Sequence, residues 1–161
     1  MTPRAIVHIN GEREAGMPDQ CLFCRMIQGE VPTPVVYESE TAFAFLDYRP
    51  LFLGHCLVLP RRHVPTLPDL PAELVGPFFQ EVQLLTGAVE AAMAAQGTFV
   101  AMNNRISQSV PHLHVHVVPR NRGDGLKGFF WPRTRYHSDE QMETVRAAVA
   151  EAAARLRAET S

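Results

Sequence analysis

The chain has 161 residues, of which 46% are hydrophobic and 20% are charged, and its formal net charge is −2. These values are typical of one folded domain and exclude a disordered, collagen-like or fibrous chain. The chain is less basic than a general nucleic-acid binder and lacks both the ~18–20 apolar residues of a membrane span and a signal peptide, so we expect a cytoplasmic protein that binds neither long nucleic acid nor membrane.

The predicted elements follow one another as in an α+β domain. Residues 1–17 form an N-terminal extension, and a short helix over 22–28 is expected to end at Gly29. Apolar residues at helical spacing after Pro71 predict a long helix that Pro77 kinks or restarts. Five segments have the pattern of strands in a mostly antiparallel sheet, and they cover residues 35–37, 41–46, 56–59, 98–102 and 113–118.

The end of the chain is predicted to form a separate helix. The main domain spans 18–136, and a capping box at Ser138–Gln141 opens a C-terminal helix over 137–161. Four apolar residues of this helix are expected to face inward, namely Met142, Val145, Val149 and Leu156.

The distribution of charge indicates the kind of ligand, and the number of cysteines indicates whether disulfides form. Five basic residues between Val118 and Tyr136, opposed only by Asp124, favour a small anionic ligand. These basic residues are Arg120, Arg122, Lys127, Arg133 and Arg135. An odd number of cysteines (Cys21, Cys24 and Cys56) argues against a disulfide framework.

Three histidines alternate with apolar residues near the end of the predicted sheet. Side chains alternate between the two faces of a strand, so His112, His114 and His116 share one face while the apolar row between them packs into the core. A core does not require three aligned imidazoles, and the chain has seven histidines in all. Two chemical interpretations stay open, metal binding and nucleophilic attack on phosphorus.

The segment His112–Val118 resembles the signature of the histidine triad (HIT) superfamily, which contains nucleotide hydrolases and transferases. The similarity to small bacterial HIT proteins extends over about Gln20 to Trp131. It includes the segments 21–24, 44–47, 54–60, 61–63 and 108–109. The resemblance implies a HIT-like fold whose sheet is extended across a homodimer.

The resemblance also implies a role for each residue at a matching position. His114 would be the nucleophile that attacks the α-phosphorus, and His116 would bind phosphate oxygens. His55 matches a fourth histidine, while Gln108 and Ser109 match polar residues that contact the phosphate or the leaving group. Implied substrates are dinucleoside polyphosphates, nucleoside phosphoramidates or similar adenosine compounds.

The nucleoside would lie in an apolar slot beside one carboxylate. Asp47 matches the carboxylate that accepts hydrogen bonds from the ribose hydroxyls. The remaining positions that match nucleotide-binding residues are Phe23, Met26, Val31, Phe45 and Asn103. The loop Asn103–Gln108 departs from the family pattern, because it is shorter and lacks a glycine before the glutamine.

A structural zinc ion is the implied cofactor. Cys21, Cys24, His63 and His112 match a closed Cys₂His₂ shell, in which His112 is a ligand and takes no part in catalysis. One alternative is a mononuclear zinc hydrolase that uses all three triad histidines as ligands. Another is a nucleotide-binding regulator with little turnover.

Overall fold

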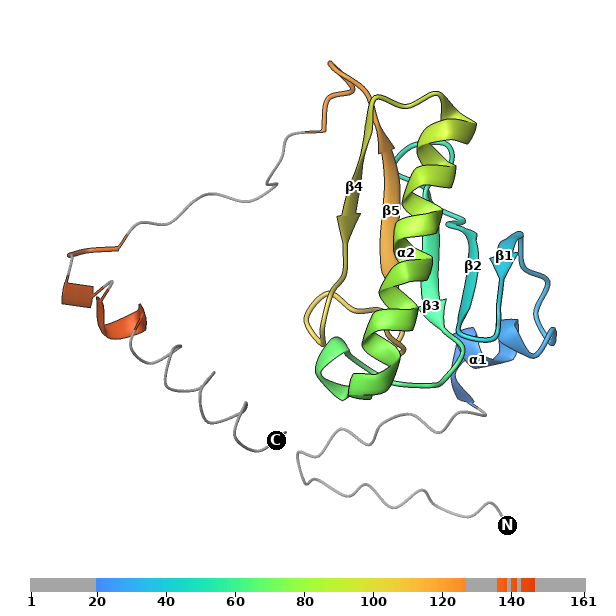
Figure 1. Ribbon diagram of the computed structural model, residues 1–161, viewed down its shortest axis with the longest axis horizontal. Helices are drawn as coiled ribbons and strands as arrows, with labels where there is room; N and C mark the ends of the chain where they lie inside the picture. Colours follow the sequence, from blue (N-terminus) through green and yellow to red (C-terminus); the bar gives the residue numbers. More distant parts are fainter. Residues whose placement is uncertain (1–19, 127–135, 139, 142, 147–161) are drawn as a thin grey trace, which may run out of the picture. The chain divides into compact units, whose positions relative to one another are not determined.

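The computed structural model describes residues 20–126, 136–138, 140–141 and 143–146. Contacts divide the chain into two units, Met1–Asp124 and Gly125–Ser161. The first unit holds the helices and strands that are labelled in Figure 1. These are α1 (Leu22–Ile27), β1 (Val35–Glu38), β2 (Ala42–Leu46), β3 (Cys56–Pro60), the 3₁₀ turn η2 (Leu67–Asp69), α2 (Ala72–Met93), β4 (Gly97–Ala101) and β5 (Val115–Arg120).

The five described strands form one sheet in the order β1-β2-β3-β5-β4. Every neighbouring pair is antiparallel, which confirms the predicted sheet. The α1 helix ends as expected at Gly29, whose positive φ of 78° follows the C-cap residue Gln28.

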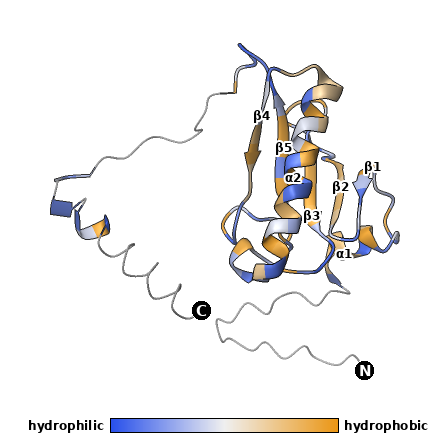
Figure 2. Cartoon of the chain, in the orientation of Figure 1, coloured by the Kyte–Doolittle hydropathy of each residue, from blue (hydrophilic) through white to orange (hydrophobic). Residues whose placement is uncertain are grey.

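Alternation along the strands separates two hydrophobic clusters on opposite faces of the sheet. Ala42, Ala44 and Val58 pack with the buried residues of α2 on one face. Phe43 and Leu57 pack with α1 on the other face. In Figure 2, α2 carries both polar and apolar residues, whereas β2 and β3 are largely apolar, as expected for strands that are buried on both faces. The face that α2 leaves open is therefore the face of α1.

Two predicted elements need correction. The α2 helix runs through Pro77 without a restart, because a proline this close to the N-terminus removes one early hydrogen bond and the buried face, from Phe78 onward, outweighs that loss. A kink at Pro77 stays a prediction. The last strand begins at Val115 rather than Leu113, since the Leu113 amide donates to the Val64 carbonyl at 2.7 Å instead of joining the ladder. His112 and His114 thus lie immediately before β5, and only His116 lies within it.

The second unit contains the helix start that the sequence predicts. The Gln141 amide donates to the Ser138 hydroxyl at 3.1 Å, and the His137 amide donates to the Gln141 side-chain oxygen at 2.7 Å. Val145 has 42% of its surface exposed, and its packing inward against other residues stays a prediction. Several predictions fall outside the described residues. They concern the inward residues Met142, Val149 and Leu156, the N-terminal extension 1–17, and the basic residues Lys127, Arg133 and Arg135.

No helix within the described ranges has the length and apolar character needed to cross a membrane.

Gly54 fixes the backbone immediately before His55. Its φ is +92°, and a Cβ atom there would lie 2.5 Å from Met93 Cγ and 2.8 Å from Met93 Sδ. Only glycine adopts this φ without strain, and the Met93 side chain of α2 would have to shift to admit a Cβ atom. The loop that delivers His55 therefore depends on this residue.

Gly54→Ala is expected to destabilise the protein by about 2 kcal/mol, since it combines a positive-φ penalty with a steric clash. Gly29→Ala is the matched control, because Gly29 has a φ of +78° and a Cβ there meets nothing within 4 Å. It should cost only about 1 kcal/mol. Urea unfolding of both variants measures the difference, and equal losses would show that the contact with Met93 is unimportant.

Candidate functional site

The triad histidines lie on the α1 face of the sheet. Leu113, Val115 and Val117 are fully buried in the cluster beneath α2, so the residues between them project to the other side. The rings of His114 and His116 lie 5.1 Å apart. The shared face predicted from the alternation is therefore present, although the first two histidines precede the strand.

A backbone carbonyl sets the protonation of the His114 ring. His114 Nδ1 lies 2.7 Å from the carbonyl oxygen of His112. A carbonyl oxygen only accepts hydrogen bonds, so Nδ1 carries the proton and donates it. In the neutral ring the lone pair is then on Nε2, which leaves this nitrogen available as a nucleophile.

His55 and His116 form a hydrogen-bonded pair beside His114. His55 Nε2 lies 3.0 Å from His116 Nδ1, and the backbone amide of Leu51 donates to His55 Nδ1 at 3.2 Å. Burial, followed by the charges of His114 and His55, lowers the pKa of His116 to about 4. Burial also lowers the pKa of His55, against the opposing charge of Asp47. Both shifts favour the neutral form of the ring at pH 7.

The Asp47 carboxylate adjoins this pair. Its Oδ1 atom accepts a hydrogen bond from the Arg49 amide at 2.7 Å, and its Oδ2 atom lies 3.7 Å from His55 Nδ1. Asp47 is only partly exposed, with 21% of its side-chain surface accessible. One carboxylate oxygen is thus held by the local turn while the other faces the histidines.

The apolar residues predicted for the nucleoside slot belong to a single cluster. Phe23, Met26 and Phe45 are buried in the cluster on the α1 face, and Val31 packs against it. The Phe23 ring lies edge-on to His114 with 5.2 Å between centroids, and 5.6 Å from the Phe45 ring. Apolar contacts and the central histidine therefore meet at α1.

Hydrogen bonds within the loop, and from the loop to Pro65 and Leu67, hold the segment before the triad. Gln108 Nε2 donates to the Pro65 carbonyl at 2.6 Å, and Gln108 Oε1 accepts from the Arg105 amide at 2.8 Å. Asn103 is exposed and donates to the Ser107 carbonyl, while Ser109 is exposed. Arg105 and Ser107 have φ values of 69° and 58°, so non-glycine residues occupy the left-handed region in this loop.

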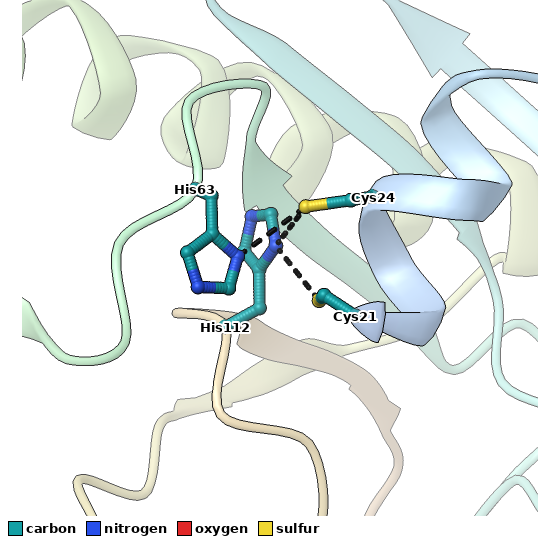
Figure 3. A group of neighbouring side chains, drawn as sticks. All are labelled: Cys21, Cys24, His63 and His112. Atoms are coloured by element: carbon teal, nitrogen blue, oxygen red, sulfur yellow. Dashed lines mark hydrogen bonds between the residues drawn. The ribbon is translucent and has the colours of Figure 1, made fainter. Parts of the chain in front are cut away.

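A second group of side chains gathers two cysteines of the α1 segment with two histidines from distant parts of the chain (Figure 3). Cys24 Sγ lies 3.3 Å from His63 Nδ1 and 3.6 Å from His112 Nδ1, and Cys21 Sγ lies 3.6 Å from the same His112 nitrogen. All four ligand atoms lie within 4.8 Å of one another. The structure therefore brings together the four residues predicted to bind zinc.

The donor set and its spacing fit a tetrahedral metal shell. Zinc bonds of ~2.3 Å to sulfur and ~2.0 Å to nitrogen place such ligands about 3.5 Å apart. His112 Nε2 donates to the Pro60 carbonyl at 2.8 Å, which leaves the lone pair on Nδ1, the nitrogen that faces the cysteines. With four protein ligands the shell would be closed, as in structural sites.

Sequence reasoning missed the backbone groups that orient the histidines. These groups are the carbonyls of His112 and Pro60 and the amide of Leu51. No residue-type pattern identifies them, because every residue offers the same backbone carbonyl and every residue except proline offers the same amide hydrogen. The sequence also gave no sign that Gln108 would bond to Pro65.

Comparisons with known proteins agree with this geometry. The HIT domain family model matches residues 28–123. A Bacillus subtilis relative named Protein hit is 30% identical over 82% of this chain and 93% of its own length. An adenosine 5′-monophosphoramidase of Candida albicans is 32% identical over 70% of this chain and 78% of its own length. An asymmetrical bis(5′-nucleosyl)-tetraphosphatase of Schizosaccharomyces pombe is 34% identical over 67% of this chain, which spans 59% of that enzyme.

Solved structures show the same fold. A HIT family protein from Bacillus subtilis superposes with a TM-score of 0.73 at 30% identity, covering 82% of this chain and 96% of that one. A histidine triad family protein from Mycobacterium smegmatis, described as zinc-bound, gives a TM-score of 0.64 at 33% identity and covers 86% of this chain and 99% of that one.

Proposed function

Because the chain belongs to the HIT family, we propose that it is a nucleotide hydrolase or nucleotidyl transferase that forms a covalent intermediate on His114. The observation that supports this most directly is the 2.7 Å hydrogen bond from His114 Nδ1 to the His112 carbonyl. It leaves Nε2 as the nucleophilic nitrogen, and the same carbonyl stabilises the positive charge that the ring acquires on attacking phosphorus.

The reaction proceeds in two displacements. His114 Nε2 donates its lone pair to the α-phosphorus, and the bond from phosphorus to the leaving group breaks. The leaving group departs with the electron pair and takes up a proton from solvent. Water then attacks the phosphorus and gives up a proton to solvent, and the N–P bond breaks, which releases a nucleoside monophosphate and restores the neutral ring. In a transferase another nucleophile replaces water. His116 donates from Nε2 to a phosphate oxygen, and His55 supports His116 from behind.

The nucleoside lies beside α1. Phe23, Met26, Val31 and Phe45 supply the apolar walls, and Asp47 Oδ2 accepts hydrogen bonds from the ribose hydroxyls. Gln108, Ser109 and Asn103 flank the phosphate from the loop, with one Gln108 amide hydrogen already used by Pro65.

The substrate class is an adenosine compound with a good leaving group on its α-phosphate. Relatives act, by their names, on an adenosine phosphoramidate and on a dinucleoside tetraphosphate. Two further relatives and one solved structure carry only general HIT names, which state no activity. The second candidate function is therefore a nucleotide-binding regulator with little turnover. Measured turnover decides between these two functions.

The Cys₂His₂ cluster holds a structural zinc in this proposal. Bound zinc would join α1 to the segment before β5 through Cys21, Cys24, His63 and His112. The alternative of a catalytic zinc on all three triad histidines is disfavoured, because His112 Nδ1 faces the cysteines while His114 Nδ1 donates to a carbonyl.

The protein is also proposed to be a homodimer. Among the described strands β4 lies at an edge of the sheet, and Val100 on it is exposed, so a second copy can extend the sheet there. Light scattering after size exclusion tests this, and a monomeric mass at micromolar concentration would contradict it.

Trapping the intermediate tests the proposed function. An adenosine 5′-phosphoramidate labelled at the α-phosphate is mixed with enzyme and quenched in base, where N–P bonds survive. Label is expected on the peptide that contains His114. Turnover with no label on this peptide would contradict the covalent mechanism, and neither turnover nor label would favour a regulator.

A further inference from the structure

The backbone amide of Leu51 is hydrogen-bonded to one of the active-site histidines, His55. It donates to His55 Nδ1 at 3.2 Å, so this nitrogen must be the acceptor of the ring. A neutral imidazole then carries its proton on Nε2, the atom that lies 3.0 Å from His116 Nδ1. His55 is therefore the donor and His116 Nδ1 the acceptor.

These assignments also determine what His116 and Asp47, on either side of His55, can offer a ligand. Because His116 accepts at Nδ1, its proton is on Nε2, where it can be donated to a bound phosphate. Because His55 Nδ1 accepts from Leu51, it has no proton to offer Asp47 Oδ2, 3.7 Å away. That oxygen remains available as an acceptor for a ligand hydroxyl.

We propose that the Leu51 amide is a positioning group that selects the tautomers of His55 and His116 and keeps Asp47 Oδ2 unoccupied. The Leu51 side chain itself is exposed and plays no part. If the amide were absent, His55 could carry its proton on Nδ1 and donate it to Asp47. His116 would then have to donate from Nδ1, and its Nε2 would become an acceptor that faces the phosphate with a lone pair.

The alternative interpretation of this cluster is a metal site, since Asp47, His55 and His116 offer ligand atoms within 4.8 Å of one another. The hydrogen bonds disfavour it. With Nδ1 of His55 accepting from Leu51, Nε2 must carry the proton, and a metal could bind there only if the ring became an imidazolate. The 3.0 Å contact to His116 is thus a hydrogen bond.

Long-range ¹H–¹⁵N correlation spectra of the wild-type protein at pH 7 test the tautomers directly, because protonated and bare ring nitrogens differ in ¹⁵N shift. We expect both His55 and His116 to be protonated on Nε2. A proton on Nδ1 of either ring would overturn the proposal, and this measurement needs no variant.

Two substitutions then identify the group that selects the tautomer. Leu51→Pro removes the amide hydrogen, and Leu51→Ala retains it as the matched control. The proline variant, folded by its amide spectrum, should shift His55 toward the Nδ1–H form, whereas the alanine variant should not. Asp47→Ala should leave the His55 tautomer unchanged, because Leu51 and not Asp47 sets it. An unchanged tautomer in Leu51→Pro, or a changed one in Asp47→Ala, would contradict the proposal.

The consequence for turnover rests on the proposed function. Leu51→Pro is expected to lower kcat at least tenfold relative to Leu51→Ala and to raise KM, since the phosphate loses a donor and Asp47 gains a competing partner. If the wild type proves inactive on nucleotides while the tautomers are as assigned, the proposed function fails and the role of Leu51 stands. If turnover is present but the tautomers differ from those assigned, the role of Leu51 fails and the proposed function stands.

Discussion

Replacing His114 with alanine is expected to lower kcat for an adenosine phosphoramidate by about 10⁴-fold or more, the scale of loss seen when a covalent nucleophile is removed. Nucleotide binding should change far less, because the apolar cluster and Asp47 are untouched. Steady-state kinetics and calorimetric titration with adenosine monophosphate measure the two effects separately.

The control for this variant is His137→Ala, which removes an exposed imidazole from the second unit. It should leave both kinetics and binding unchanged. His114→Ala also leaves the His112 carbonyl without its donor, at a cost of about 1–3 kcal/mol, so a melting curve must show that the variant is folded. Substantial turnover by folded His114→Ala would refute the covalent mechanism.

Local sequence patterns sufficed for most of the fold. Gly29 ends α1 because glycine tolerates positive φ, and the strand predicted over residues 41–46 is β2, Ala42–Leu46. Long-range contacts explain the errors. The start of β5 depends on Val64, which is distant in sequence, and the continuity of α2 through Pro77 depends on the buried face that follows it.

The candidate site divides in the same way. The sequence pattern and the family resemblance together predicted which side chains belong to the site. The structure gathers these side chains around His114 and around Cys24. The pattern and the resemblance did not predict which nitrogen of each ring is protonated. That property depends on backbone atoms of Leu51, Pro60 and His112, whose positions follow only from the tertiary fold.

The second large effect is expected at the cysteine–histidine cluster. Cys24→Ser removes a sulfur that lies within 3.6 Å of both histidine ligands, and a serine hydroxyl is a much poorer zinc ligand than a thiolate. Zinc content after dialysis should fall from about one ion per chain to near zero. Loss of the bound ion should lower stability by about 3 kcal/mol, or Tm by roughly 10 °C.

Cys56→Ser makes the same chemical change outside the cluster and is the matched control. Cys56 is buried in the core beneath α2 and its thiol donates to the Gly54 carbonyl, so this variant should retain zinc even if packing loses some stability. A chelator should lower the Tm of the wild type and of Cys56→Ser toward the Tm of Cys24→Ser. The Tm of Cys24→Ser itself should not change when the chelator is added. Equal zinc content in all three proteins would remove the metal from the proposal. Loss of zinc without loss of stability would show that α1 is held by its apolar contacts alone, through Phe23 and Met26 against the sheet.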